Sequence, residues 1–360
     1  MLKILYILFF CNSLIQQAPI YGTRSIHRPK ELWMPRIEVD WVGESTKKNI
    51  LLASHMESLQ ILKKFDKDFL LSRLLPEGNI EHRNNKEITT NGAELDLLIN
   101  KLLLEIDARA KEYTDFIVLK NQDFNRKLRC GLAVLKFKKY PFVLKLFIER
   151  PESFIKPYAK GVQPYFFYFM GGGINRHLMG FTRIKNLEII REQIKKDPYW
   201  SEIIDTPRKW FWLPKEPKYL ELRAYNLNTI DEQIIQIPAI YALVADLITS
   251  NKELSLRSKT SRELGIKLSR VVGNRIDPHM GNFMLEDFSL DSSGQKIEKI
   301  VLIDTEHFPS LVGLKKPLEF DGYLSWYLQL IGKFTQEKFL RTKQYRKQFQ
   351  INPPAEFLAL

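Results

Sequence analysis

Three apolar segments with the two-residue period of β-strands, all within residues 115–147, constrain the fold of this chain most strongly. They read "DFIVLK", "GLAVLKF" and "FVLKLF", and only the turn "KKYP" separates the second from the third. Short strands that follow one another through tight turns pair as an antiparallel meander. The region therefore predicts a small antiparallel sheet.

One charged side chain interrupts the third of these segments. Lys145 alternates with Val143 and Phe147, and the residues that take the other face of the strand are apolar as well. Both faces should therefore be buried. A lysine in this setting must either extend its ammonium group to solvent or meet an anion in a cleft. A lysine at the edge of the sheet is the alternative, and this strand alone leaves the choice open.

Two stretches farther along the chain carry acids in a setting that suits phosphate and metal chemistry. "RIDPHMGNFML" brings Asp277, His279 and Asn282 close together before an apolar run, and Asp304 ends the apolar segment "KIVLID". Carboxylate and amide oxygens are the ligands that Mg²⁺ prefers, and an aspartate can also accept a proton from a reacting hydroxyl. His279 could orient Asp277 or contact phosphate, and an ordinary histidine in a turn is an equal alternative.

In order and spacing, these residues resemble the protein kinase-like superfamily. Asp277 and Asn282 stand five apart, as do the Asp and Asn of H-R-D-x-x-x-x-N, and Asp304 ends a strand-like run as the D-F-G aspartate does. Lys145 in "FVLK" is similar to the lysine of V-A-I-K. "DPHMGN" and "IDTEHF" resemble the lipid kinases and also the aminoglycoside phosphotransferases and choline kinases, and they do not decide between these branches.

The resemblance implies an α+β, two-lobed kinase-like fold with a small antiparallel sheet lobe and a larger helical lobe. It also implies transfer of a phosphoryl group from ATP, with Mg²⁺, to a hydroxyl of a lipid, a small molecule or a protein. Asp277 and His279 would be the catalytic residues. Lys145 would bind the phosphates of the nucleotide, and Asn282 and Asp304 would hold the metal ion.

Several departures from the family pattern leave other functions open. "NQDFNRKLRCG", between the first two strands, offers only Gly131 in place of G-x-G-x-x-G, and Thr305 and Glu306 replace Phe-Gly after the metal aspartate. Arg275 and Ile276 stand before the catalytic aspartate. No single acid is the evident partner of the strand lysine, and the candidates are Glu149, Glu152, Glu188 and Glu192.

Two alternative functions follow from these departures. The first is a kinase-fold binding module without catalysis. The second is a metal-dependent hydrolase in which Asp277, His279, Asp304 and His307 hold a transition metal that activates water. The second alternative leaves Asn282 and Lys145 without a role, and the chain contains only six histidines.

The rest of the chain is organised around these motifs. Apolar residues at three- and four-residue spacing predict helices, and the aromatic stretches "KWFWLP" and "KYLELRAYNL" predict a pair of strands. The expected helices lie at 49–75, 92–113, 186–196 and 230–250 and in the tail at 322–349. The expected divisions are a signal peptide at 1–22, a helical N-terminal extension at 23–112, the sheet lobe at 113–222 and the helical lobe at 223–360.

A glycine-rich segment lies between the meander and the later helices. Three consecutive glycines, at 171–173, precede Arg176, His177 and Arg183. Backbone N–H groups of such a run can approach a phosphate, and a flexible loop is the alternative.

The N-terminus and the overall charge bear on location and partners. "MLKILYILFFCNSLIQQAPIYG" has an early lysine, a short apolar run and then polar and small residues, as a signal peptide does, which predicts an exported protein. A net charge of +13 favours phosphate-bearing partners, with nucleotides and acidic membrane surfaces as candidates. Because the chain has no Arg/Gly or Lys-rich tract, we do not expect nucleic acid to be a partner. With Cys11 removed in the leader, Cys130 would be the single thiol, which excludes an internal disulfide framework.

Overall fold

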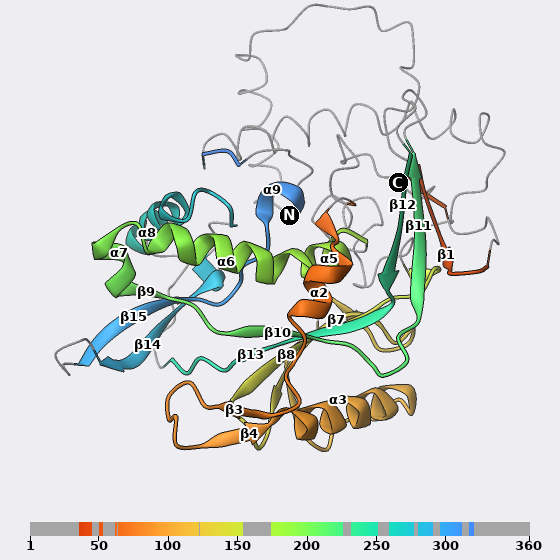
Figure 1. The fold of residues 1–360 in the computed structure, drawn as a ribbon, viewed down its shortest axis with the longest axis horizontal. Coiled ribbons are helices and arrows are strands. Elements are labelled where there is room, and N and C mark those ends of the chain that lie inside the picture. The colour runs from red at the N-terminus through yellow and green to blue at the C-terminus, as the bar shows by residue number, and fades with distance from the viewer. Residues whose placement is uncertain are drawn as a thin grey trace, which may run out of the picture.

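The computed structural model describes residues 36–44, 50–52, 62, 64–121, 123–153, 174–225, 232–250, 259–276, 280–290, 296–311 and 317–319. Within these residues the chain is a mixed α/β protein with several small antiparallel sheets (Figure 1). The expected leader, the glycines at 171–173 and the helical tail lie outside the described residues, as do Asp277 and His279.

A six-stranded sheet forms the centre of the described structure. Its strand order is β10-β13-β8-β7-β5, with β6 paired to β7, and all neighbours are antiparallel. The strands are β5 (Phe116–Lys120), β6 (Phe124–Asn125), β7 (Cys130–Phe137), β8 (Phe142–Ile148), β10 (Lys209–Trp212) and β13 (Ile240–Asp246). The predicted meander is confirmed as β5, β7 and β8. Since β8 lies between β7 and β13, the edge-strand alternative for Lys145 is wrong.

One face of this sheet packs on α3 (Gly92–Asp107), the first long described helix (Figure 1). The apolar residues of α3 recur at three- and four-residue spacing, which puts them on one helix face. That face is buried, and it joins alternate residues of β8 in one apolar cluster; the helix contributes Leu95, Ile99, Leu102 and Ile106 and the strand contributes Phe142, Leu144 and Leu146. The expected helix at 92–113 is confirmed over the range of α3.

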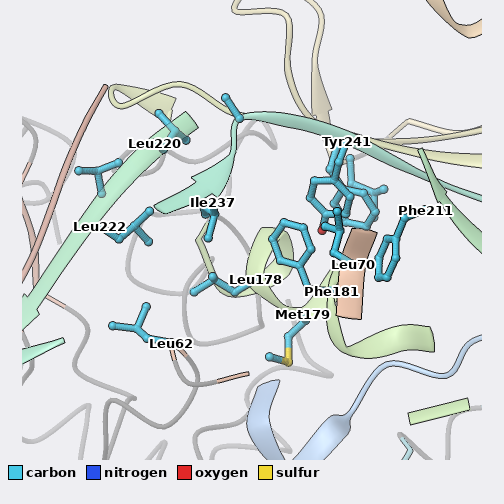
Figure 2. Packing of buried hydrophobic residues seen from close by; sticks show 14 of the residues in the cluster. Leu62, Leu70, Leu178, Met179, Phe181, Phe211, Leu220, Leu222, Ile237 and Tyr241 are labelled. Carbon is cyan, nitrogen blue, oxygen red and sulfur yellow. The ribbon is translucent and has the colours of Figure 1, made fainter. Parts of the chain in front are cut away.

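The opposite face of the sheet carries Lys145 and meets a second apolar cluster, which we call the aromatic core. It gathers around Phe147, Phe181, Phe211 and Tyr241, together with Leu178 and Met179 of α5 (Ile174–Gly180) (Figure 2). The rings of Phe147 and Tyr241 stack with centroids 4.6 Å apart. The prediction that both faces of β8 are buried is confirmed on the α3 face and in part on this one, where Phe147 is buried and Val143 and Lys145 are partly exposed.

A four-stranded antiparallel sheet covers the far side of the aromatic core, with the order β12-β11-β1-β2. Its strands are β1 (Arg36–Trp41), β2 (Ile50–Leu52), β11 (Tyr219–Tyr225) and β12 (Glu232–Pro238). The expected helix at 49–75 is wrong at β2, and α2 (Lys67–Ser72) is the α-helix that the structure describes in that range. Ile50–Leu52 pairs with β1, and β1 pairs with β11. Because β11 is remote from β1 in sequence, the local spacing of apolar residues could not predict this sheet.

The expected helix at 230–250 is also wrong, because this segment forms β12 and β13. Pro238 ends β12, and proline lacks an N–H group and would interrupt a helix at this point. Isoleucine and valine, which recur through the segment, also suit strands. The expected pairing of "KWFWLP" with "KYLELRAYNL" is wrong as well, since β10 pairs with β13, and β11 pairs with β1 and β12.

Helices and two small sheets make up the remaining described structure. The helix α6 (Thr182–Ile194) extends from the aromatic core, where it contributes Ile184, to a third apolar cluster, where it contributes Ile190 and Ile194. That cluster also includes residues of α7 (Pro198–Ile203), α8 (Lys259–Val271), β9 (Ile204–Asp205), β14 (Phe283–Leu290) and β15 (Lys296–Leu302). The remaining elements are β3 (Asn79–Glu81), β4 (Thr89–Asn91), the 3-10 helix η3 (Met280–Asn282) and α9 (Phe308–Leu311). The two small sheets are β14-β15-β9 and β3-β4.

Two sequence expectations are confirmed in this part of the fold. The helix at 186–196 is the main part of α6, and the apolar segment that Asp304 follows is the strand β15. Because α6 belongs to two apolar clusters, it ties the central sheet to the region of β14 and β15. Among the described residues, no helix is both long enough and apolar enough to cross a membrane.

Candidate functional site

A hairpin brings Asn282, the last polar residue of the first motif, next to Asp304. β14 begins directly after Asn282 and pairs antiparallel with β15, with Phe283 opposite Leu302. The residue before β14 and the residues after β15 are therefore neighbours. The carbonyl oxygen of Asn282 accepts hydrogen bonds from the Ile303 N–H at 2.9 Å and the Asp304 N–H at 3.5 Å.

Lys145 reaches Asp304 from the central sheet. Its Nζ donates to Asp304 Oδ2 at 2.9 Å, and the two side chains are 19% and 24% exposed. This pair is partly shielded from water, which strengthens the attraction relative to an exposed surface pair. The lysine that the sequence places on a buried strand face thus meets an anion, and Lys145, Asp304 and the backbone of Asn282 lie together.

Arg183, near the start of α6, binds two acids of the same loop. Its Nη1 donates to Asp304 Oδ1 and its Nη2 donates to Glu306 Oε2. The Glu306 N–H also donates to Asp304 Oδ1, at 3.2 Å. Both carboxylate oxygens of Asp304 therefore have donors, with Lys145 on one oxygen and Arg183 on the other.

Thr305, between the two acids in sequence, is buried and hydrogen-bonded. Its Oγ1 donates to the Arg183 carbonyl oxygen at 2.7 Å and accepts from Lys209 Nζ at 2.7 Å. Lys209, on β10, also donates to the Ile303 carbonyl oxygen at 3.0 Å. The loop after β15 is consequently held by side chains from β8, β10 and α6.

The charges of this cluster determine its protonation. Burial alone would raise the pKa of the Asp304 carboxyl, but Arg183, Lys145 and Lys209 outweigh burial and hold that pKa well below its ordinary value. Burial lowers the pKa of Lys145, and the charge of Arg183 lowers it further. Burial also holds the pKa of Lys209 well below its ordinary value, with Lys145 as the next cause. Burial opposes the charge of Arg183, but Asp304 and Glu306 raise its pKa overall. Asp304 is therefore a carboxylate near neutral pH.

A polar network also holds this loop, and it includes positions where the sequence departs from the kinase pattern. Arg275 Nε donates to Asn186 Oδ1 at 2.7 Å, and Asn186 Nδ2 donates to the Thr305 carbonyl oxygen at 3.0 Å. The Phe308 N–H donates to the Arg275 carbonyl oxygen at 3.0 Å. Arg275 and Thr305 are thus parts of one hydrogen-bonded support for the loop that carries Asp304.

His307 belongs to this support as well. The ring is buried, and its Nδ1 lies 2.7 Å from Ser310 Oγ. The backbone N–H of His307 donates to Thr182 Oγ1 at 3.2 Å. Burial, followed by the charges of Arg275 and Lys64, lowers its pKa to about 3. His307 is therefore a neutral ring held by hydrogen bonds inside the protein.

Three residues of this region carry oxygen atoms of the kind that Mg²⁺ prefers. Asp304, Glu306 and Asn282 carry carboxylate or amide oxygens, and Mg²⁺ is usually bound by one or two carboxylates together with substrate phosphates. Within the residues that the structure describes, no group of three or more His, Cys, Asp or Glu side chains is arranged to hold a metal ion.

Three of the four candidate partners of Lys145 named from the sequence have other contacts. Glu149 accepts from Ser153 Oγ, Glu188 pairs with Arg73 and Glu192 pairs with Lys195. The acid that the structure places against the strand lysine is Asp304 itself.

Sequence reasoning missed the positions of Arg183, Lys209 and Glu306 in this cluster. A signal existed for Lys209, because it begins the apolar strand "KWFW" just as Lys145 interrupts another. Arg183 gave no comparable signal, since it lies among other basic residues of "FTRIKN". No family model, curated protein or solved structure matches the chain.

Proposed function

We propose that this chain is an ATP- and Mg²⁺-dependent phosphotransferase with a two-lobed kinase-like arrangement. The observation that carries the proposal is the 2.9 Å ion pair between Lys145 Nζ and Asp304 Oδ2, beside the backbone of Asn282. Phosphoryl transfer needs a cation for the phosphates and hard oxygen ligands for a metal within one site. The two features come from distant parts of the sequence, so their meeting is a property of the fold.

The roles of the residues follow from their chemistry. Lys145 binds phosphate oxygens of the nucleotide, and Asp304 and Asn282 supply oxygen ligands to the metal. Mg²⁺, when bound, neutralises charge on the phosphates throughout the reaction. Asp277 accepts the proton of the acceptor hydroxyl while the hydroxyl oxygen bonds to the terminal phosphorus and the bond from that phosphorus to ADP breaks.

The acceptor carries a hydroxyl on a lipid, a small molecule or a protein. The net charge of +13 supports an acceptor that also bears phosphate, or one at an acidic membrane surface. The sequence of residues 1–22 supports export, and an exported enzyme of this kind would work where ATP is present, such as inside a host cell.

A binding module without catalysis is the second candidate, and one observation favours it. Lys145 and Arg183 each donate to one carboxylate oxygen of Asp304, so cations of the chain already neutralise the charge that a metal would use. The hydrolase alternative has less support, because His307 is a buried ring whose Nδ1 lies against Ser310.

Two substitutions separate these functions. Under the phosphotransferase proposal, Asp304→Asn abolishes both the Mg²⁺-dependent stabilisation by nucleotide and the turnover. Asp277→Asn keeps nucleotide binding while transfer falls by about 10² to 10⁴, the range of a general base. Thermal shifts with Mg²⁺-ATP, phosphate-transfer assays and metal analysis measure these outcomes.

Asp246→Asn is the matched control for the loss of a buried, arginine-paired carboxylate. Asp246 is 4% exposed and accepts from Arg208 in the same central sheet, outside the site. This control should keep nucleotide binding and turnover. Nucleotide binding without turnover in the parent chain would favour the binding module. Loss of bound zinc or iron in both the Asp277→Asn and the Asp304→Asn variants would favour the hydrolase. Equal loss of nucleotide binding in the Asp277 and Asp304 variants would refute the division of roles.

A further inference from the structure

The acids of the proposed metal site are already neutralised by cations of the chain. Asp304 Oδ2 accepts from Lys145, and Asp304 Oδ1 accepts from Arg183 and from the Glu306 N–H. The Glu306 carboxylate accepts from the second arm of the same arginine. Two acids therefore face two cations, and Lys209 adds a further basic group through Thr305.

Arg183 is held in this position by the fold. It is 2% exposed, and its own carbonyl oxygen accepts from Thr305 Oγ1 at 2.7 Å, so its backbone is bound to the loop that its guanidinium contacts. An arginine fork binds carboxylates with fixed geometry and keeps its charge at all physiological pH values. Arg183 is therefore a permanent charge beside Asp304.

This arrangement opposes a divalent cation that arrives alone. Such an ion would bring two positive charges to a cluster without net negative charge, and it would compete with Arg183 and Lys145 for the oxygens of Asp304. A polyphosphate brings the missing negative charge. Its oxygens can accept from Lys145 and Arg183, which releases carboxylate oxygens for the metal.

We propose that Arg183 is a resident counter-ion that makes metal binding at Asp304 depend on a polyphosphate ligand. The proposal rests on the proposed function, because the polyphosphate is the phosphate chain of the nucleotide. It adds an order to binding: the polyphosphate binds without metal, and the metal binds tightly only with it. Arg183 is a positioning residue in this scheme, since it acts through Asp304 and Glu306.

The test uses the full chain, Mn²⁺ as a metal with the same preference for oxygen ligands, and inorganic tripolyphosphate. Equilibrium dialysis measures metal on the protein at matched concentrations of free Mn²⁺. In the parent chain, Mn²⁺ should bind about tenfold or more weakly alone than with tripolyphosphate. Tripolyphosphate without metal should bind measurably. Equally tight binding of Mn²⁺ with and without tripolyphosphate overturns the proposal.

Arg183→Gln should reverse both preferences. It removes the guanidinium, with its positive charge, from Asp304 Oδ1, so Mn²⁺ alone should bind about tenfold or more tightly than in the parent, and tripolyphosphate alone should bind more weakly. Arg191→Gln is the control, because Arg191 is another arginine of α6 and contacts Thr206 and Pro207 outside the site. It should behave as the parent. Unchanged Mn²⁺ affinity in Arg183→Gln overturns the proposal.

Glu306→Gln tests the same electrostatics without removing Arg183. It takes away one acid, so tripolyphosphate alone should bind more tightly and Mn²⁺ alone no better than in the parent. Weaker or unchanged tripolyphosphate binding in this variant contradicts the proposal even where Arg183→Gln does not fold. If the parent chain binds Mn²⁺ tightly without tripolyphosphate, only this inference is refuted. If the chain binds neither polyphosphate nor Mg²⁺-ATP under any condition, the proposed function is refuted as well.

Discussion

Acid should destabilise this protein through His177, a histidine that lies inside the aromatic core. The ring is 1% exposed, packs edge-on against Tyr241 at 4.9 Å and Phe181 at 5.7 Å, and has its Nε2 2.8 Å from the Pro238 carbonyl oxygen. Burial lowers its pKa to about 3, against the opposing effect of the bond to Pro238. The folded state therefore keeps His177 neutral at pH values where the unfolded chain protonates it.

The size of the effect follows from proton linkage. Above the unfolded pKa of about 6.5, His177 is neutral in both states and contributes no pH dependence. As the pH falls below that value, His177 binds a proton in the unfolded state but stays neutral in the folded state. The free energy of unfolding therefore decreases until the pH reaches the folded pKa. At pH 5 the loss from this one group is about 2 kcal/mol. Because pH 5 lies above the folded pKa, the unfolded value sets this magnitude.

His177→Gln tests this reasoning, since glutamine can keep a donor near Pro238 but cannot be protonated. Urea unfolding of parent and variant at pH 8.5, 7.5 and 5.0 gives the free energies. The variant should be less stable at pH 7.5, because it loses ring packing, but its loss between pH 7.5 and 5.0 should be smaller than the parent's by about 2 kcal/mol. Between pH 8.5 and 7.5 the difference between parent and variant should stay constant. The same loss in parent and variant from pH 7.5 to 5.0 would show that His177 is not held neutral by the fold.

Two further predictions concern buried groups near the same core. Burial raises the pKa of Glu149 well above its ordinary value, so its stabilising effect is present at low pH and is lost as the pH rises through the folded pKa. Glu149→Gln should therefore raise the melting temperature at pH 8 more than at pH 5. The control is Glu152→Gln, because Glu152 is exposed, and it should show no such difference between the two pH values. A larger gain for Glu149→Gln at pH 5 would contradict this prediction. Gly180 has no room for a side chain, because an added Cβ would lie 1.8 Å from Tyr241 Oη, so Gly180→Ala should cost at least about 1 to 3 kcal/mol of unfolding free energy. Tyr241→Phe removes that oxygen. In urea unfolding, the double variant Gly180→Ala/Tyr241→Phe should therefore lose less unfolding free energy than the sum of the losses in the two single variants. Strict additivity of the two losses would refute the steric explanation.

Local sequence patterns predicted the parts of the fold that depend on local structure. The alternation in "FVLKLF" identified β8 and placed both faces of the strand in the interior, and the leucine spacing of 92–107 identified α3. At 230–250 the same kind of reasoning failed, because the apolar residues fit a helix as well as two strands. β13 is a strand because β8 and β10 lie on either side of it, and neither neighbour is close to it in sequence.

The candidate site divides in the same way. The strand alone left the partner of Lys145 open, and the resemblance to kinases is what put Lys145 with Asp304, where the structure places an ion pair. Arg183 and Glu306 could not be assigned, because the sequence does not show which surface-like charges on a helix or loop turn inward. Their positions depend on the packing of α6 against the loop after β15.

The pairing of β1 with β11 has a consequence for how the chain is made. Arg36 lies opposite Tyr225, so β1 leaves the ribosome long before its partner exists, and at 5–20 residues per second about 190 further residues take roughly 10 to 40 s. During that time the edge of β1 and its apolar residues Ile37 and Val39 have no native cover from β11, and such unpaired strands are prone to aggregate. Slow long-range pairing of this kind also lowers the folding rate. The completion of this sheet therefore waits for synthesis of β11, at a point in the chain far from Asp304.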